Sequence, residues 1–186
     1  MIGVALTSVR RKFRELVRRD DGVATFEFVL LFPLFVGVMV SGAESGLLLT
    51  RYAMLERSLD MAVRTIRLSS GNPVDPDVIR QEICDTATVF EDCMNNLTVE
   101  MTRVYDSTTD TWAFPANGVV CVDRDENAEP VVQFQQGAAN EVMFVRACVV
   151  VDLIFPTAWL GGSLVKDPNG NFQVVAKSAF AIEPDV

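Results

Sequence analysis

The residues of this chain with the clearest capacity for chemistry are its four cysteines, Cys84, Cys93, Cys121 and Cys148. An even number of cysteines in a domain exposed to an oxidising compartment predicts two disulfides. Three pairings are possible, and we favour Cys84–Cys93 with Cys121–Cys148, because each pair lies within one local supersecondary unit. A zinc site is the alternative, but the chain has no CxxC spacing and no histidine.

Motifs of enzymatic chemistry are missing from the sequence. Without histidine the commonest general base is absent, and there is no glycine-rich phosphate loop and no GxSxG. The acidic run that starts at Asp123 resembles the start of an EF-hand loop. Its sixth position is Ala128 and its twelfth is Phe134, where calcium binding requires glycine and glutamate. We therefore expect a solvated loop, no metal, no cofactor and no enzymatic activity.

One acid and one proline stand out at the start of a long apolar run. Glu27 opens the run, where the positive end of a helix dipole favours a carboxylate. Pro33 lies inside it and removes one backbone hydrogen bond, which predicts a kink near residues 29–33. The plainer interpretation of Glu27 is a side chain that rests at a membrane surface.

The apolar run itself predicts one membrane-spanning helix. Phe28 to Ala43 contains 16 residues without a charge, and extension to Thr50 adds only one acid, Glu44. A helix of the 23 residues from Phe28 to Thr50 is ~35 Å long, enough for a hydrocarbon core of about 30 Å. Few helices of soluble cores are apolar on every face for that length.

The charges predict how the helix is oriented. Residues 1–21 carry six basic and three acidic residues, whereas the rest of the chain carries ten basic and 22 acidic residues. A basic segment beside an apolar span stays in the cytoplasm. The residues beyond Thr50 would then lie outside the inner membrane, and their acidity argues against nucleic-acid binding.

Two helices are expected next. Residues 51–69 continue the first helix with an apolar stripe at steps of three and four residues. Its members are Tyr52, Leu55, Leu59, Ala62, Val63 and Ile66. Gly71 and Pro73 should end this helix, and Asp75-Pro76 should cap another that runs to Asn95-Asn96. The buried stripe of this next helix is expected to be Val78, Ile79, Ile83, Ala87 and Phe90.

From residue 97 the pattern changes to period two, which predicts a strand, and the apolar run over residues 141–154 predicts a strand that is buried for much of its length. We expect strands from residue 97, within residues 111–122 around Val119, Val120 and Val122, over residues 141–154 and over residues 172–182, with turns at residues 106–110 and 167–170. The expected fold class is α+β: a long N-terminal helix packed on an antiparallel sheet of about four strands. A further apolar cluster is expected to lie in the core, with a partner-binding or membrane-skimming patch as the alternative. Its members are Leu153, Ile154, Phe155, Pro156, Trp159 and Leu160.

The segment Gly22-Val23-Ala24-Thr25-Phe26-Glu27-Phe28 resembles a type IV prepilin processing site of the Flp/Tad subclass. Together with Pro33 it is most similar to the TadE-like minor pilins, or pseudopilins. The close resemblance covers about residues 18–50. The rest of the chain agrees with the family only in the order of its parts, an amphipathic helical extension and then a domain with cysteines. It implies a pilin-like fold and a structural role in the initiation, tip or base of a Tad pilus that serves adhesion.

The resemblance also implies roles for particular residues. A prepilin peptidase would cut after Gly22 and leave Val23 as the new N-terminus, with Glu27 and Phe28 as the fifth and sixth mature residues. The ammonium of Val23 on one subunit would pair with Glu27 on a neighbour, because an acid inside a membrane is normally paired. The implied partners are the inner membrane, the peptidase, other pilins and the Tad assembly platform.

The expected organisation has four parts: a leader at 1–22, a transmembrane helix at 23–50, its amphipathic extension at 51–70 and a periplasmic domain at 71–186. Two alternatives stay open. The first is an uncleaved single-pass scaffold whose periplasmic domain docks partners of a secretion or pilus machine. The second is a secreted domain released by signal peptidase after Ala43, since Ser41-Gly42-Ala43 offers small residues.

Overall fold

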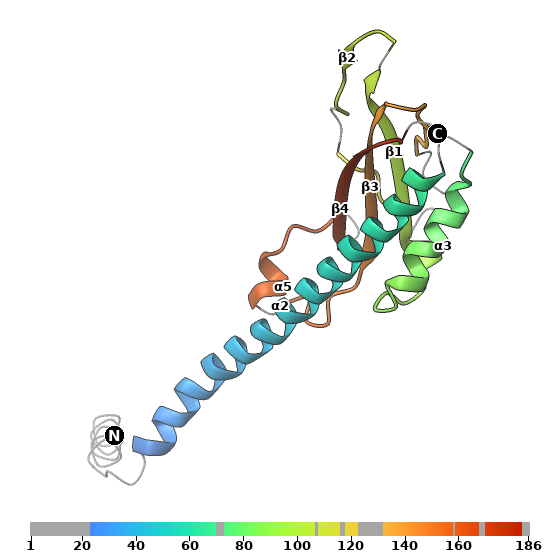
Figure 1. The fold of residues 1–186 in the computed structure, drawn as a ribbon. Coiled ribbons are helices and arrows are strands. Elements are labelled where there is room, and N and C mark those ends of the chain that lie inside the picture. Colours follow the sequence, from blue (N-terminus) through green and yellow to red (C-terminus); the bar gives the residue numbers. More distant parts are fainter. Residues whose placement is uncertain are drawn as a thin grey trace, which may run out of the picture. The chain divides into compact units, whose positions relative to one another are not determined.

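The computed structural model describes residues 23–69, 73–106, 108–115, 118–122, 132–157, 159–167 and 170–183. The chain divides into two compact units, Met1–Ala43 and Glu44–Val186. In the first unit the described residues form one helical segment. The second unit is an α+β domain, so the predicted fold class is confirmed at that level (Figure 1).

Helix α2, Val23–Leu68, runs through both units without interruption. It continues through Pro33, so the proline does not end the helix, and the kink stays a prediction. The backbone N–H and the hydroxyl of Ser69 both donate to the carbonyl of Ile66, which closes the last turn. The predicted stop residue Gly71 lies outside the described residues.

The amphipathic part of α2 buries the predicted stripe with one exception. Leu55, Leu59, Ala62, Val63 and Ile66 are buried. Tyr52 is exposed and was wrongly included in that stripe.

The second predicted helix divides into two elements, α3, Pro76–Thr86, and α4, Cys93–Asn96. Asp75 caps α3 as predicted, and its carboxylate accepts from the N–H of Asp77 at 3.0 Å. The predicted end at Asn95-Asn96 is wrong. The chain leaves the helix after Thr86, because Cys84 and Cys93 are joined and Asp92 adopts a left-handed conformation with φ of 50°.

The four strands form one antiparallel sheet in the order β2-β1-β3-β4. Their bounds are β1, Leu97–Asp106; β2, Thr111–Trp112; β3, Val142–Val151; and β4, Phe172–Ala181. The strands expected from 97, over 141–154 and over 172–182 are therefore confirmed. A register shift between Arg103 and Tyr105 interrupts the alternation of β1, so Val104 is buried rather than outward-facing.

The strand expected around Val119, Val120 and Val122 is wrong. The strand after the first turn is the short β2, whereas residues 118–122 form neither helix nor strand. The hydroxyl of Thr98 donates to the carbonyl of Val120 at 2.7 Å, and Cys121 is bonded to Cys148. These links hold the segment over a face of the sheet, and the nearby edge of β1 is paired with residues 133–135 instead.

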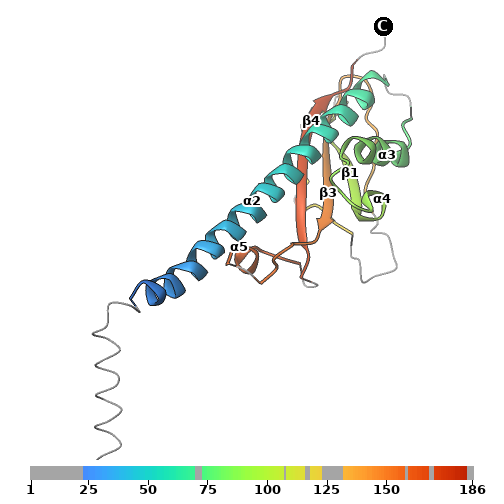
Figure 2. The same cartoon turned by 90° about the horizontal axis from the view of Figure 1, so that it is seen from below.

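The core lies on one face of the sheet, beneath α2 residues 55–66 and α3 (Figure 2). Alternate residues of β1 and β3 point into it, including Val99, Met101 and Val145. From α3, Ile79 and Ile83 are fully buried. Val78 is 56% exposed, so its place in the predicted buried stripe is wrong. Both helices therefore cover the same face.

Candidate functional site

The predicted processing and assembly residues lie at the N-terminal end of α2. Gly22 falls outside the described residues. Val23 is the first described residue of α2, and Glu27, Phe28 and Pro33 follow along the same helix. Glu27 is exposed, and the rings of Phe28 and Phe32, one turn apart, stack with centroids 5.0 Å apart. The structure thus places Glu27, Phe28 and Pro33 on one continuous helix.

The helix that carries Glu27 is long and apolar enough to cross a membrane, the only such helix among the described residues. Its large apolar side chains between Phe26 and Met39 are 38–68% exposed. An uncovered apolar surface of this length is compatible with insertion of the chain as a single-pass membrane protein.

Glu44, the acid that ends the uncharged run, has a role that sequence reasoning missed. Its side chain is only 2% exposed. Its two carboxylate oxygens accept from the backbone N–H groups of Ile154 and Phe155, each at 3.2 Å. A lone acid directly after 16 uncharged residues was the available signal. Its partners lie 110 and 111 residues away and could not be named from the sequence.

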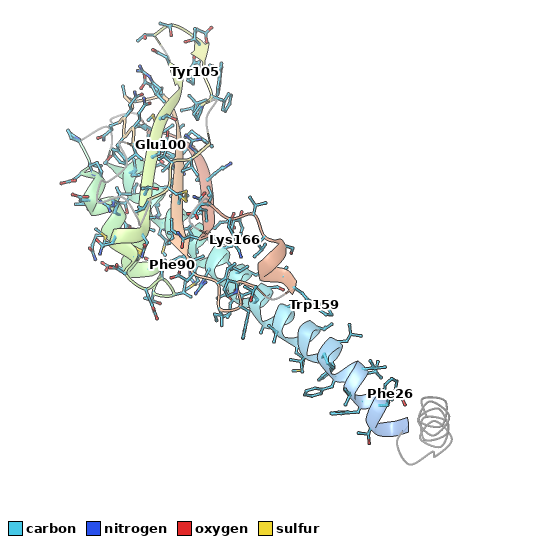
Figure 3. The ribbon with its side chains drawn as sticks, turned by 180° about the vertical axis from the view of Figure 1, so that it is seen from behind. Phe26, Phe90, Glu100, Tyr105, Trp159 and Lys166 are labelled. Atoms are coloured by element: carbon cyan, nitrogen blue, oxygen red, sulfur yellow. A yellow bond between two sulfur atoms is a disulfide. The ribbon has the colours of Figure 1, made fainter. Side chains whose placement is uncertain are left out.

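The apolar cluster at Leu153–Leu160 is not core, so that prediction is wrong. Ile154 is 54% exposed, Phe155 is 41% exposed and Trp159 is 59% exposed. Figure 3 labels Trp159 at the short helix that follows the strand β3. The physical reason is that α2 and α3 already fill the covered face of the sheet. The segment after β3 instead turns away and forms the short helix α5, Trp159–Ser163.

The structure contains both favoured disulfides, Cys84–Cys93 and Cys121–Cys148. The first joins α3 to α4. The second joins residue 121 to the central strand β3, on the face of the sheet opposite α2. The first therefore ties two short helices together and the second ties an irregular segment to a strand, which gives the cysteines a structural role.

Removal of the longer disulfide should cost more stability than removal of the shorter one. The bonded cysteines are 27 residues apart in one case and 9 in the other. Chain entropy then predicts a loss of about 3.5 kcal/mol for Cys121→Ala/Cys148→Ala and about 2.5 kcal/mol for Cys84→Ala/Cys93→Ala. Denaturant unfolding of the detergent-solubilised chain, followed by near-UV circular dichroism, measures both. A larger loss from the shorter loop would contradict this ranking.

An aromatic group on the β1–β2 hairpin is a second surface feature that the sequence analysis did not single out. The Tyr105 and Trp112 rings lie 4.9 Å apart, and Phe114 continues the row at 6.3 Å from Trp112. Tyr105 donates its hydroxyl to Asp110, and this bond together with the negative charge raises the pKa of the phenol. Trp112 and Phe114 are mostly exposed.

No group of three or more cysteine, aspartate or glutamate side chains in the described part of the chain is placed to hold a metal ion. The acidic loop at residues 123–130 lies outside the described residues. In comparisons with known proteins, no family model, no curated protein and no solved structure matches this chain.

Proposed function

We propose that this chain is a TadE-like minor pilin of a Tad pilus, matured by a prepilin peptidase that cuts after Gly22. In this proposal α2 crosses the inner membrane with its N-terminus in the cytoplasm, and the disulfide-bonded domain lies in the periplasm or on the pilus. Its role is structural, in the initiation, tip or base of the fibre. Support comes from the Gly22–Phe28 pattern, from the one membrane-length apolar helix among the described residues and from the α+β domain that follows it.

The observation that carries the proposal is the position of Glu27. Its exposed carboxylate stands on α2 directly before the 16 uncharged residues that begin at Phe28. A carboxylate at the edge of a hydrocarbon layer is costly unless a cation neutralises it. Cleavage after Gly22 would create that cation, an ammonium at Val23, and a neighbouring subunit would bring it to Glu27 when helices pack side by side.

Gly22→Ala is expected to leave most of the protein unprocessed in cells that contain the peptidase. The reason is that the extended backbone must approach the peptidase active site closely, and glycine leaves room for it. Intact-mass measurement of the purified native chain reads the N-terminus directly, with Val23 expected for the natural sequence.

The matched control is Gly42→Ala, a glycine within α2. A Cβ at Gly42 meets no atom within 4 Å, so this change should leave processing unaltered. A natural chain that begins at Met1, or a Gly22→Ala variant that is processed normally, would refute the proposed maturation.

The alternative function is that of an uncleaved single-pass scaffold whose periplasmic domain docks other proteins. The observation that favours it is Asp20-Asp21, because a basic residue usually precedes the glycine in prepilins. For such a scaffold Gly22→Ala would be silent, whereas changes on the periplasmic domain would abolish function.

Release of a secreted domain after Ala43 has less support. Ala43 lies inside α2, and the next residue, Glu44, is tied to Ile154 and Phe155. Signal peptidase needs an extended segment at its cut. Cell fractionation would distinguish this case, since the released domain would be soluble.

A further inference from the structure

The exposed apolar segment after β3 belongs to a stretch with no charge. Thirteen residues, 153–165, lie between Asp152 and Lys166 without a charged side chain. Ile154, Phe155 and Trp159 are 41–59% exposed, and Val165 is 89% exposed. We call the described residues of this stretch, 153–157 and 159–165, the apolar loop. A soluble surface seldom gathers so many large apolar side chains without a partner.

The apolar loop is held in a defined conformation. A Cβ on Gly161 would lie 2.1 Å from the carbonyl oxygen of Phe155, so the backbone of α5 packs directly on the preceding turn. Lys166 donates to the carbonyl of Pro156 at 2.6 Å and closes the other side. The exposed side chains therefore stand on a preformed support.

Two contacts fix the apolar loop to α2. Glu44 accepts from the N–H groups of Ile154 and Phe155. Seven residues further along, Arg51 donates to the carbonyl of Asp152 at 2.9 Å. Seven residues are two helical turns, or ~10 Å, so both contacts lie on one side of α2. The apolar loop is thus attached at the point where the uncharged run ends.

If α2 crosses a membrane with Glu27 at one boundary, the length of the uncharged run puts Glu44 near the other. Glu27 and Glu44 are 17 residues apart on one helix, which is ~26 Å along the axis. This is a few Å less than the hydrocarbon core of about 30 Å. A membrane crossed by α2 would therefore reach Glu44, whose carboxylate needs hydrogen-bond donors there. The apolar loop supplies two such donors to Glu44.

We propose that the apolar loop is a second membrane contact, which lies in the headgroup–acyl boundary of the bilayer that α2 enters. Tryptophan favours this boundary, because its ring is apolar and its N–H needs a polar partner. The occupant of the surface is lipid rather than another protein, because the surface is uncharged and is attached to α2 at Glu44, the residue that follows the uncharged run. The inference requires that α2 crosses the membrane and holds for a pilin or for a scaffold.

Tryptophan fluorescence tests the proposal directly, since the chain has two tryptophans, Trp112 and Trp159. Trp112 belongs to β2, at the end of the sheet away from α5 (Figure 1). In the Trp112→Phe variant all the emission comes from Trp159. We expect phosphatidylcholine brominated near the headgroup to remove most of this emission when one full-length chain occupies each lipid nanodisc.

The matched control is Trp159→Phe, whose remaining Trp112 should keep its emission in the same discs. A second pair of variants tests the attachment: Glu44→Ala should lower the quenching of Trp159, whereas Glu56→Ala, at an exposed acid of the same helix, should not. Normal emission from Trp159 in chains held by the disc would overturn the proposal. Failure of the full chain to enter discs would overturn it as well. If the emission of Trp159 is protected from the brominated lipid only when a disc holds several copies of the chain, the surface is a contact between proteins instead.

Discussion

Replacing Glu27 with alanine is expected to abolish incorporation of the chain into the proposed fibre while the disulfide-bonded α+β domain stays folded. In the proposed fibre this carboxylate neutralises the ammonium of Val23 on a neighbouring subunit. Removal of one partner leaves the other charge unpaired in a medium of low dielectric constant, which costs about 3–5 kcal/mol for a buried pair. Since each 1.4 kcal/mol is tenfold, the loss is on the order of 100-fold or more.

The measurement is the amount of this chain in sheared surface fibres relative to the amount in membranes. Glu27→Gln should be nearly as defective, because it keeps the shape and removes the charge. Glu56→Ala serves as the control, since that acid is exposed on the part of α2 beyond the uncharged run. Normal fibre content in the Glu27→Ala strain would rule out the proposed ion pair.

Glu100→Ala is expected to produce the largest loss of stability among the changes to charged residues. Glu100 accepts from Arg146 at 2.6 Å, and the side chains are 12% and 6% exposed. They are opposite each other on β1 and β3, with Lys177 next in the row on β4. Without Glu100 the buried guanidinium has lost its carboxylate and still has a lysine beside it, so we expect a cost of about 3–5 kcal/mol.

Two further variants separate this effect from a general sensitivity of the sheet. The double change Glu100→Leu/Arg146→Met should recover most of the stability, because it removes both charges and keeps the volume. Glu183→Ala breaks the ion pair with Arg67, whose side chains are 53% and 47% exposed, and should cost at most about 1 kcal/mol. Denaturant midpoints of the detergent-solubilised chains give all three values. A double variant less stable than Glu100→Ala would show that the pair itself stabilises the fold.

The sequence by itself determined the elements that depend on near neighbours. Sixteen uncharged residues and then a three- and four-residue stripe predict one long helix, because helical periodicity is local. Asp75 and Pro76 predict the start of α3 for the same reason. Alternation from residue 97, the apolar run at 141–154 and the turn before residue 172 predict three of the strands. The two disulfide pairings could also be predicted, since the bonded cysteines are close together along the chain.

Only the tertiary structure decided which surfaces are covered. Burial of an apolar side chain lowers the free energy of the folded chain, but the surface that could bury it is supplied by elements far away in the sequence. Trp159 and Phe155 are exposed because α2 and α3 had already covered the apolar face of the sheet. Glu44 is buried because a loop 110 residues later offers two N–H groups. The pairing of Glu100 with Arg146 likewise follows from strand register, which is fixed by the packed sheet as a whole.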